Sequence, residues 1–149
     1  MINQKFMKSA LEIAKQSGND IPIGAVLVKD NEIISYAHNK KEKLNQPTKH
    51  AEIIVIEEAC KKLESWRLQD CTLYVTLEPC PMCTWAIIQS RIKKVVFGSY
   101  DLLYGSLGSK LDLRQLVNSK LEVNGGILEE ECDNILKSYF EKMRYDNKK

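Results

Sequence analysis

Two short fragments carry side chains that can bind a metal ion and move protons. They are His50-Ala51-Glu52 and Pro79-Cys80-Pro81-Met82-Cys83. Cysteines three residues apart on the first turn of a helix lie on one face, so both sulfur atoms can reach one ion. The free N–H groups at the start of a helix also favour the thiolate over the thiol. With His50, the fragments supply one nitrogen and two sulfur ligands, a set that suits zinc rather than magnesium or calcium.

Three protein ligands leave the fourth position of tetrahedral zinc open for water, as in catalytic zinc sites. Bound zinc lowers the pKa of that water to about 7, which makes hydroxide available at neutral pH. Glu52 lies two residues after His50, so the first helical turn can direct its carboxylate to the water rather than to zinc. Such a carboxylate can accept the water proton and pass it to a leaving nitrogen. The order His-x-Glu followed by Pro-Cys-x-x-Cys is the signature of zinc deaminases.

The two cysteines also admit other interpretations. They could be buried thiols or a redox pair, although a redox pair would leave the His-x-Glu fragment unexplained. A closed, structural zinc site would need a fourth protein ligand. The candidates for that ligand are His38, Cys60, Cys71 and Cys132. The three thiols among them border expected apolar helix faces or a strand, so burial alone would account for them.

Length and composition indicate a single globular domain, residues 1–149. Of the residues, 44% are apolar and 28% are charged, and the net charge of +2 neither requires nor excludes a local basic surface. No apolar run approaches the ~20 residues that span a bilayer. No secretory signal is recognisable, so we expect a cytoplasmic protein without a membrane segment. Five cysteines, an odd number, argue against a disulfide framework.

Hydrophobic periodicity predicts helices and strands that alternate along the chain. Helices are expected over residues 3–17, 51–63 and 81–90, and again from Cys132 to Met143. Strands are expected over 24–28, 33–36, 72–77 and 94–97, with a weaker one at 121–123. Thr48 is a plausible cap for the second helix, and residues 98–109 have no clear pattern. Alternating strands and helices imply a three-layer α/β/α sandwich, and the opening hairpin makes its five-stranded sheet mixed.

Several longer runs resemble the bacterial tRNA adenosine deaminases of the TadA family. The run from Val75 to Cys83 does so, together with Ser90-Arg91-Ile92 and Val95-Val96-Phe97-Gly98. Pro22 to Val28 and Gly125 to Glu129, with the final helix, are similar too, so the resemblance covers nearly the whole chain. It implies a homodimeric zinc enzyme with a cytidine deaminase-like fold that converts the wobble adenosine (position 34) of tRNA to inosine. An arginine tRNA is the substrate that the resemblance suggests.

The resemblance also implies roles for individual residues. Hydroxide would attack C6 of the adenine, Glu52 would shuttle protons and ammonia would leave. The tRNA anticodon loop is single-stranded, so its bases can be splayed into a pocket at modest cost. Asn39 would contact the flipped base, the Ala51 backbone and the Pro79 carbonyl would line the pocket, and Asp101 would touch a neighbouring nucleotide. From the residues alone, Asn39 is equally an ordinary turn residue and Asp101 an ordinary surface carboxylate.

Some features leave other functions open. The loop Tyr100-Asp101-Leu102-Leu103-Tyr104 is apolar where many family members carry basic residues, and its rings could stack on bases or pack on a second subunit. Trp66 and Trp85 are expected in the core or in a dimer interface. A deaminase of free guanine, cytosine or a nucleoside would share the zinc motif. A zinc module that only binds RNA or protein is a third hypothesis, and it requires four protein ligands.

Overall fold

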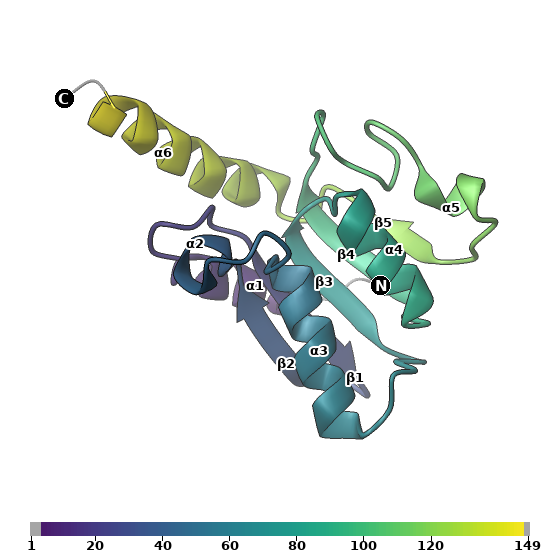
Figure 1. Ribbon diagram of the computed structural model, residues 1–149. Helices are drawn as coiled ribbons and strands as arrows, with labels where there is room; N and C mark the ends of the chain where they lie inside the picture. The colour runs from purple at the N-terminus through teal and green to yellow at the C-terminus, as the bar shows by residue number, and fades with distance from the viewer. Residues whose placement is uncertain (1–3, 148–149) are drawn as a thin grey trace.

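A five-stranded mixed sheet forms the centre of the computed structural model, which describes residues 4–147 (Figure 1). The strands are β1 (Gly24–Lys29), β2 (Glu32–His38), β3 (Thr72–Leu77), β4 (Lys94–Ser99) and β5 (Glu122–Asn124). Their order is β2-β1-β3-β4-β5. Strand β1 pairs antiparallel with β2 and β3, whereas β3, β4 and β5 run parallel. The mixed sheet that the opening hairpin predicted is confirmed.

The hairpin between β1 and β2 closes through two residues, Asp30 and Asn31. Both have positive φ angles, 51° and 63°. Two-residue hairpin loops require this left-handed backbone to match the twist of the strands, and Asp and Asn tolerate it well. The turn therefore brings β2 back along β1, with Lys29 opposite Glu32.

Helices cover both faces of the sheet, which gives the expected three layers. On one face lie α1 (Gln4–Ala14) and α6 (Glu129–Asn147), and on the other lie α3 (Ala51–Leu63) and α4 (Pro81–Gln89) (Figure 1). Alternate residues of a strand point to opposite faces. In β1, Ala25 and Leu27 join the core beneath α3 and α4, whereas Val26 and Val28 join the core beneath α1. Both faces of the sheet are therefore packed.

The N-terminus of α3 differs from its prediction. Thr48 does not cap this helix; His50 occupies the N-cap position, and its side chain makes no capping hydrogen bond. Instead, the Ala51 N–H donates to Oδ1 of Asn39 at 2.8 Å. A distant side chain has replaced the local cap, because β2 ends beside the start of α3 and brings Asn39 within reach.

Two single-turn helices escaped prediction, namely α2 (Lys41–Leu44) and α5 (Leu113–Leu116). Four residues are too few to display a helical period. The first expected helix is found as α1, whose predicted start at Asn3 lies outside the described residues. None of the helices that the structure describes is long and apolar enough to cross a membrane.

Part of the expected burial is absent. The apolar face of α6 is covered only near its start, and Phe140 and Met143 are 44% and 41% exposed. The later turns of α6 extend past the sheet, as the yellow helix in Figure 1 shows. Trp66 and Trp85 are 53% and 45% exposed, so their placement in the core was wrong. A dimer interface remains the interpretation for both.

Candidate active site

The structure brings His50, Cys80 and Cys83 together at one edge of the sheet. Strands β2 and β3 run in the same direction, because both are antiparallel to β1. Helix α3, which comes after β2 and the short α2, and helix α4, which comes after β3, therefore begin at the same edge. His50 is the N-cap residue of α3, Cys80 is the N-cap residue of α4, and Cys83 lies in the first turn of α4.

The three donor atoms are spaced for a single ion. His50 Nδ1 lies 3.7 Å from Cys80 Sγ and 3.5 Å from Cys83 Sγ, and all three atoms are within 4.8 Å of one another. In the described part of the chain, no other group of three His, Cys, Asp or Glu residues could hold a metal. A nitrogen and two sulfurs without a fourth protein ligand fit zinc with one open position.

The electrostatics of the Cys80 and Cys83 thiols favour metal binding. The pKa of Cys80 is lowered to about 4, because its sulfur accepts hydrogen bonds from Cys83 and His50, although burial opposes this shift. The pKa of Cys83, which donates to Cys80, is raised. Contact with Cys80 also raises the pKa of His50. The lowered pKa of Cys80 favours its thiolate, which is the form of cysteine that binds metals.

Glu52 lies in the first turn of α3, two residues from His50, and is 4% exposed. Its Oε1 is buried and has no hydrogen-bond partner among residues 4–147. Burial raises the pKa of Glu52 to about 7. An unpartnered buried oxygen costs about 1–3 kcal/mol, so a native fold that retains one commonly uses it for a ligand or for chemistry. The arrangement suits a carboxylate that exchanges a proton with a molecule bound beside the three donor atoms.

Asn39 stands directly after β2 and is 6% exposed. Because its Oδ1 accepts the Ala51 N–H, it holds the backbone next to His50 in place. Its amide nitrogen carries two N–H donors, the kind of group that a ligand acceptor can bind. Contact with a base, by Asn39 and by the Ala51 backbone, stays a prediction.

Pro79 directly precedes Cys80, and Asp101 lies in the loop that follows β4. The Pro79 carbonyl accepts hydrogen bonds from the Ser106 N–H at 2.9 Å and from Thr84 Oγ1 at 3.4 Å. The Asp101 carboxylate accepts the N–H groups that follow it in its own turn. Its loop borders an apolar pocket of about 370 Å³. That pocket is lined by Ile21, Ile23, Leu77, the residues from Tyr100 to Tyr104, Leu136 and Phe140. The ligand-binding roles of Pro79 and Asp101 stay predictions.

Sequence reasoning assigned no role to Glu78, although this residue is 1% exposed. Its carboxylate accepts four hydrogen bonds, all from the loop that contains Asp101. The only signal in the sequence was a charged residue between an apolar strand and the Pro-Cys pair. Which donors it binds depends on a segment more than 20 residues away.

The closed zinc site finds no support in the described residues. None of His38, Cys60, Cys71 and Cys132 belongs to a metal-binding group. His38 Nδ1 donates to the Asn39 carbonyl at 2.9 Å, as a loop histidine commonly does. Cys71 and Cys132 are fully buried, and burial raises the pKa of both thiols.

Comparison with known proteins agrees with this geometry. Residues 1–99 match the family model described as the cytidine and deoxycytidylate deaminase zinc-binding region. The tRNA-specific adenosine deaminase of Bacillus subtilis (strain 168) is 47% identical over 150 residues, which cover 98% of this chain and 93% of that protein.

Solved structures are similar as well. One from a study of A-to-I editing by tRNA:A34 deaminases at the wobble position of transfer RNA has a TM-score of 0.82 and 38% identity. The match covers 90% of this chain and 100% of that chain. A guanine deaminase from Bacillus subtilis has a TM-score of 0.64 and 42% identity, over 67% of this chain and 66% of that one.

Proposed function

Because the chain belongs to the tRNA-specific adenosine deaminases of the cytidine and deoxycytidylate deaminase family, we propose that it hydrolyses adenosine to inosine at the wobble position of tRNA. Such an enzyme is a hydrolase acting on C–N bonds. The observation that carries the proposal is the convergence of three metal-binding side chains beside the unpartnered oxygen of Glu52. We further propose that the substrate is an arginine tRNA. Because tRNA is found in the cytoplasm, we propose that the enzyme acts there.

His50, Cys80 and Cys83 would hold zinc, which their donor atoms fit. Zinc bound there supplies a Lewis acid that lowers the pKa of a coordinated water to about 7. The Oε1 atom of Glu52 would accept a proton from the attacking water. The same carboxyl would then donate that proton to the amino nitrogen at C6, which leaves as ammonia. The position of Glu52 in a buried turn keeps its carboxyl directed at the site and away from bulk water.

Other residues would hold the RNA. The amide nitrogen of Asn39 would donate to the flipped base, which the Ala51 backbone and Pro79 would flank. Asp101 and the exposed rings of Tyr100 and Tyr104 would contact neighbouring nucleotides. Unpaired bases stack on aromatic side chains whatever their sequence, so this apolar loop suits a splayed anticodon loop.

The test is deamination of an unmodified arginine tRNA transcript with adenosine at position 34. Inosine is read as G, so sequencing of the cDNA shows a change from A to G at that position. We expect conversion there and at no other adenosine. Zinc-loaded protein that leaves the transcript unchanged would contradict the proposal.

A second candidate, deamination of free guanine, is favoured by the similarity to the guanine deaminase over two thirds of the chain. It makes a distinct prediction, because a free base needs no contacts outside the pocket. Release of ammonia from guanine, together with no change in the tRNA, would support this candidate instead.

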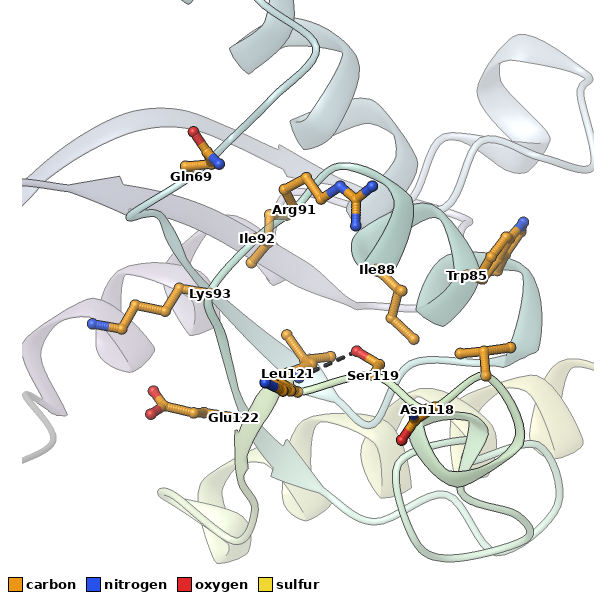
Figure 2. A pocket seen from close by; sticks show the side chains of 12 residues that line it. Gln69, Trp85, Ile88, Arg91, Ile92, Lys93, Asn118, Ser119, Leu121 and Glu122 are labelled. Carbon is orange, nitrogen blue, oxygen red and sulfur yellow. Dashed lines mark hydrogen bonds between the residues drawn. The ribbon is translucent and has the colours of Figure 1, made fainter.

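We also propose that the enzyme is a homodimer that uses the exposed face of α4. Trp85 borders a pocket of about 630 Å³, in which Trp85 and Ile88 of α4 face the segment with Asn118 and Ser119 (Figure 2). Exposed tryptophan is unusual on a monomer surface and common in interfaces. Sedimentation should give a dimer for the native chain and a shift toward monomer for Trp85→Ala. A native chain that sediments as a monomer at micromolar concentration would contradict this assignment.

A further inference from the structure

Glu78 occupies the link between the sheet and the site. It follows the last residue of β3 and precedes Pro79 and Cys80, where α4 begins. Its backbone N–H donates to the carbonyl of Ser99 at the end of β4, at 2.8 Å. Its backbone is thus attached to a rigid part of the fold, while its side chain turns inward and is 1% exposed.

The side chain of Glu78 binds only the loop of residues 100–109, between β4 and α5 (Figure 1). Oε1 accepts the Asp101 N–H at 3.1 Å and the Ser109 hydroxyl, and Oε2 accepts the N–H groups of Leu107 and Ser109, both at 3.1 Å. None of the salt bridges in residues 4–147 involves this carboxylate. A buried carboxylate without a cation depends on such donors, and the loop supplies all four.

The loop is closely fitted around this carboxyl group. A Cβ atom at Gly105 would overlap both the Glu78 carboxyl group and the carbonyl of Asp101. The Gly105 N–H donates to that same Asp101 carbonyl at 2.8 Å. Only glycine allows the backbone at position 105 to come so close to the Glu78 carboxyl group. The conformation of the loop therefore depends on this close contact with the buried carboxylate.

The loop also contacts the segment that leads into Cys80 and α4. One of the N–H groups that Glu78 accepts belongs to Asp101, whose own carboxylate orders the turn to Tyr104 through the N–H groups of Leu103 and Tyr104. Farther along the loop, the Ser106 N–H donates to the Pro79 carbonyl at 2.9 Å, next to the metal-binding Cys80. The loop is therefore held against the start of α4 at two places.

We propose that Glu78 is a positioning residue that holds loop 100–109 in the conformation that binds the nucleotides flanking the target adenosine. This inference rests on the proposed function, because it assigns the loop to RNA. Glu78 touches neither the metal-binding atoms nor the reacting base. Its effect therefore falls on RNA binding and leaves the chemical step nearly unchanged.

The test compares Glu78→Gln with the native enzyme on the tRNA transcript. The substitution keeps the shape of the side chain but places an NH₂ group against N–H donors, so at least one contact becomes repulsive. We expect KM for the RNA to rise at least about tenfold, which matches the loss of a hydrogen bond to a charged group, while kcat changes less than about threefold. Zinc content should stay at one ion per chain. Amide hydrogen exchange should become faster at Asp101, Leu107 and Ser109 and stay slow in β3 and β4.

Two further variants keep the test decisive. Gly105→Ala displaces the loop and leaves the Glu78 carboxylate intact, so it should raise KM in the same way and carries the test if Glu78→Gln does not fold. Glu58→Gln, an exposed change on α3, is the matched control and should leave KM unchanged. Unaltered KM in Glu78→Gln and Gly105→Ala, or a loss confined to kcat or to zinc content, would overturn the proposal. A native enzyme that leaves the tRNA unchanged would instead refute the proposed function.

Discussion

Replacement of Glu52 by glutamine separates proton transfer from metal binding. The amide has the size of the carboxyl group and stays in the same buried turn of α3, but it cannot accept and return a proton. General acid–base catalysis contributes about 10²–10⁴-fold to a rate, so kcat for tRNA deamination should fall by about that factor. Because Glu52 is not among the three grouped donor atoms, zinc content should remain one ion per chain.

The same substitution should not cost stability. Oε1 of Glu52 is buried without a partner, and such an atom costs the native fold about 1–3 kcal/mol. A neutral amide is cheaper to bury than a carboxylate, so the free energy of unfolding should stay equal or rise. Stability that rises while activity falls is typical of residues kept for chemistry.

The assay is single-turnover conversion of the tRNA transcript, read by cDNA sequencing, beside metal analysis and urea denaturation. Glu58→Gln on the exposed side of α3 serves as control and should match the native enzyme. A rate for Glu52→Gln within tenfold of the native rate would refute the assigned proton transfer. Loss of zinc in this variant would instead make Glu52 a ligand, contrary to the geometry.

Three further predictions concern the metal and the scaffold. Cys83→Ala removes one of the three donor atoms, so the zinc content should fall well below one ion per chain and turnover should be lost. A chelator should have the same effect on the native enzyme. Zinc retained in the variant would contradict the assigned metal site. Asp112→Ala removes the N-cap of α5 and its contact with Arg114, so urea denaturation should show a loss of about 1 kcal/mol. Hydrogen bonding by Arg114 lowers the pKa of Asp112 in the folded protein. The stabilisation by this carboxylate is therefore present above about pH 4 and is lost as the pH falls below that value. The difference in unfolding free energy between Asp112→Ala and the native chain should accordingly shrink near about pH 3. Gly24→Ala would press a methyl group against backbone atoms of Ala10 and Ala14 in α1, which cannot rotate away as a side chain could, so we expect a loss of stability of about 2 kcal/mol or more. An unchanged urea midpoint would contradict this expectation and show that the helix can shift.

Several elements could be read directly from the sequence. The limits of α3 and β3 were predicted as they are observed, because both are bounded by local breaks in hydrophobic periodicity. The turn at Asp30 and Asn31 follows from two residues that tolerate positive φ. The two metal-binding fragments were recognisable because each set of side chains lies within a few residues, so that spacing alone puts them on one helical turn.

Only the tertiary structure decided what links distant segments. The N-terminus of α3 is capped by Asn39 rather than by Thr48, and Glu78 accepts hydrogen bonds from loop 100–109. Neither contact could be predicted from hydrophobic periodicity, because each joins residues that are far apart in the sequence. The end of α6 has the apolar pattern of a buried helix, yet Phe140 is 44% exposed, because the later turns of this helix extend past the sheet. Local spacing determines which side chains can act together on one turn. Which strand end or loop lies beside that turn depends on how the whole sheet packs, and that is a property of the folded chain.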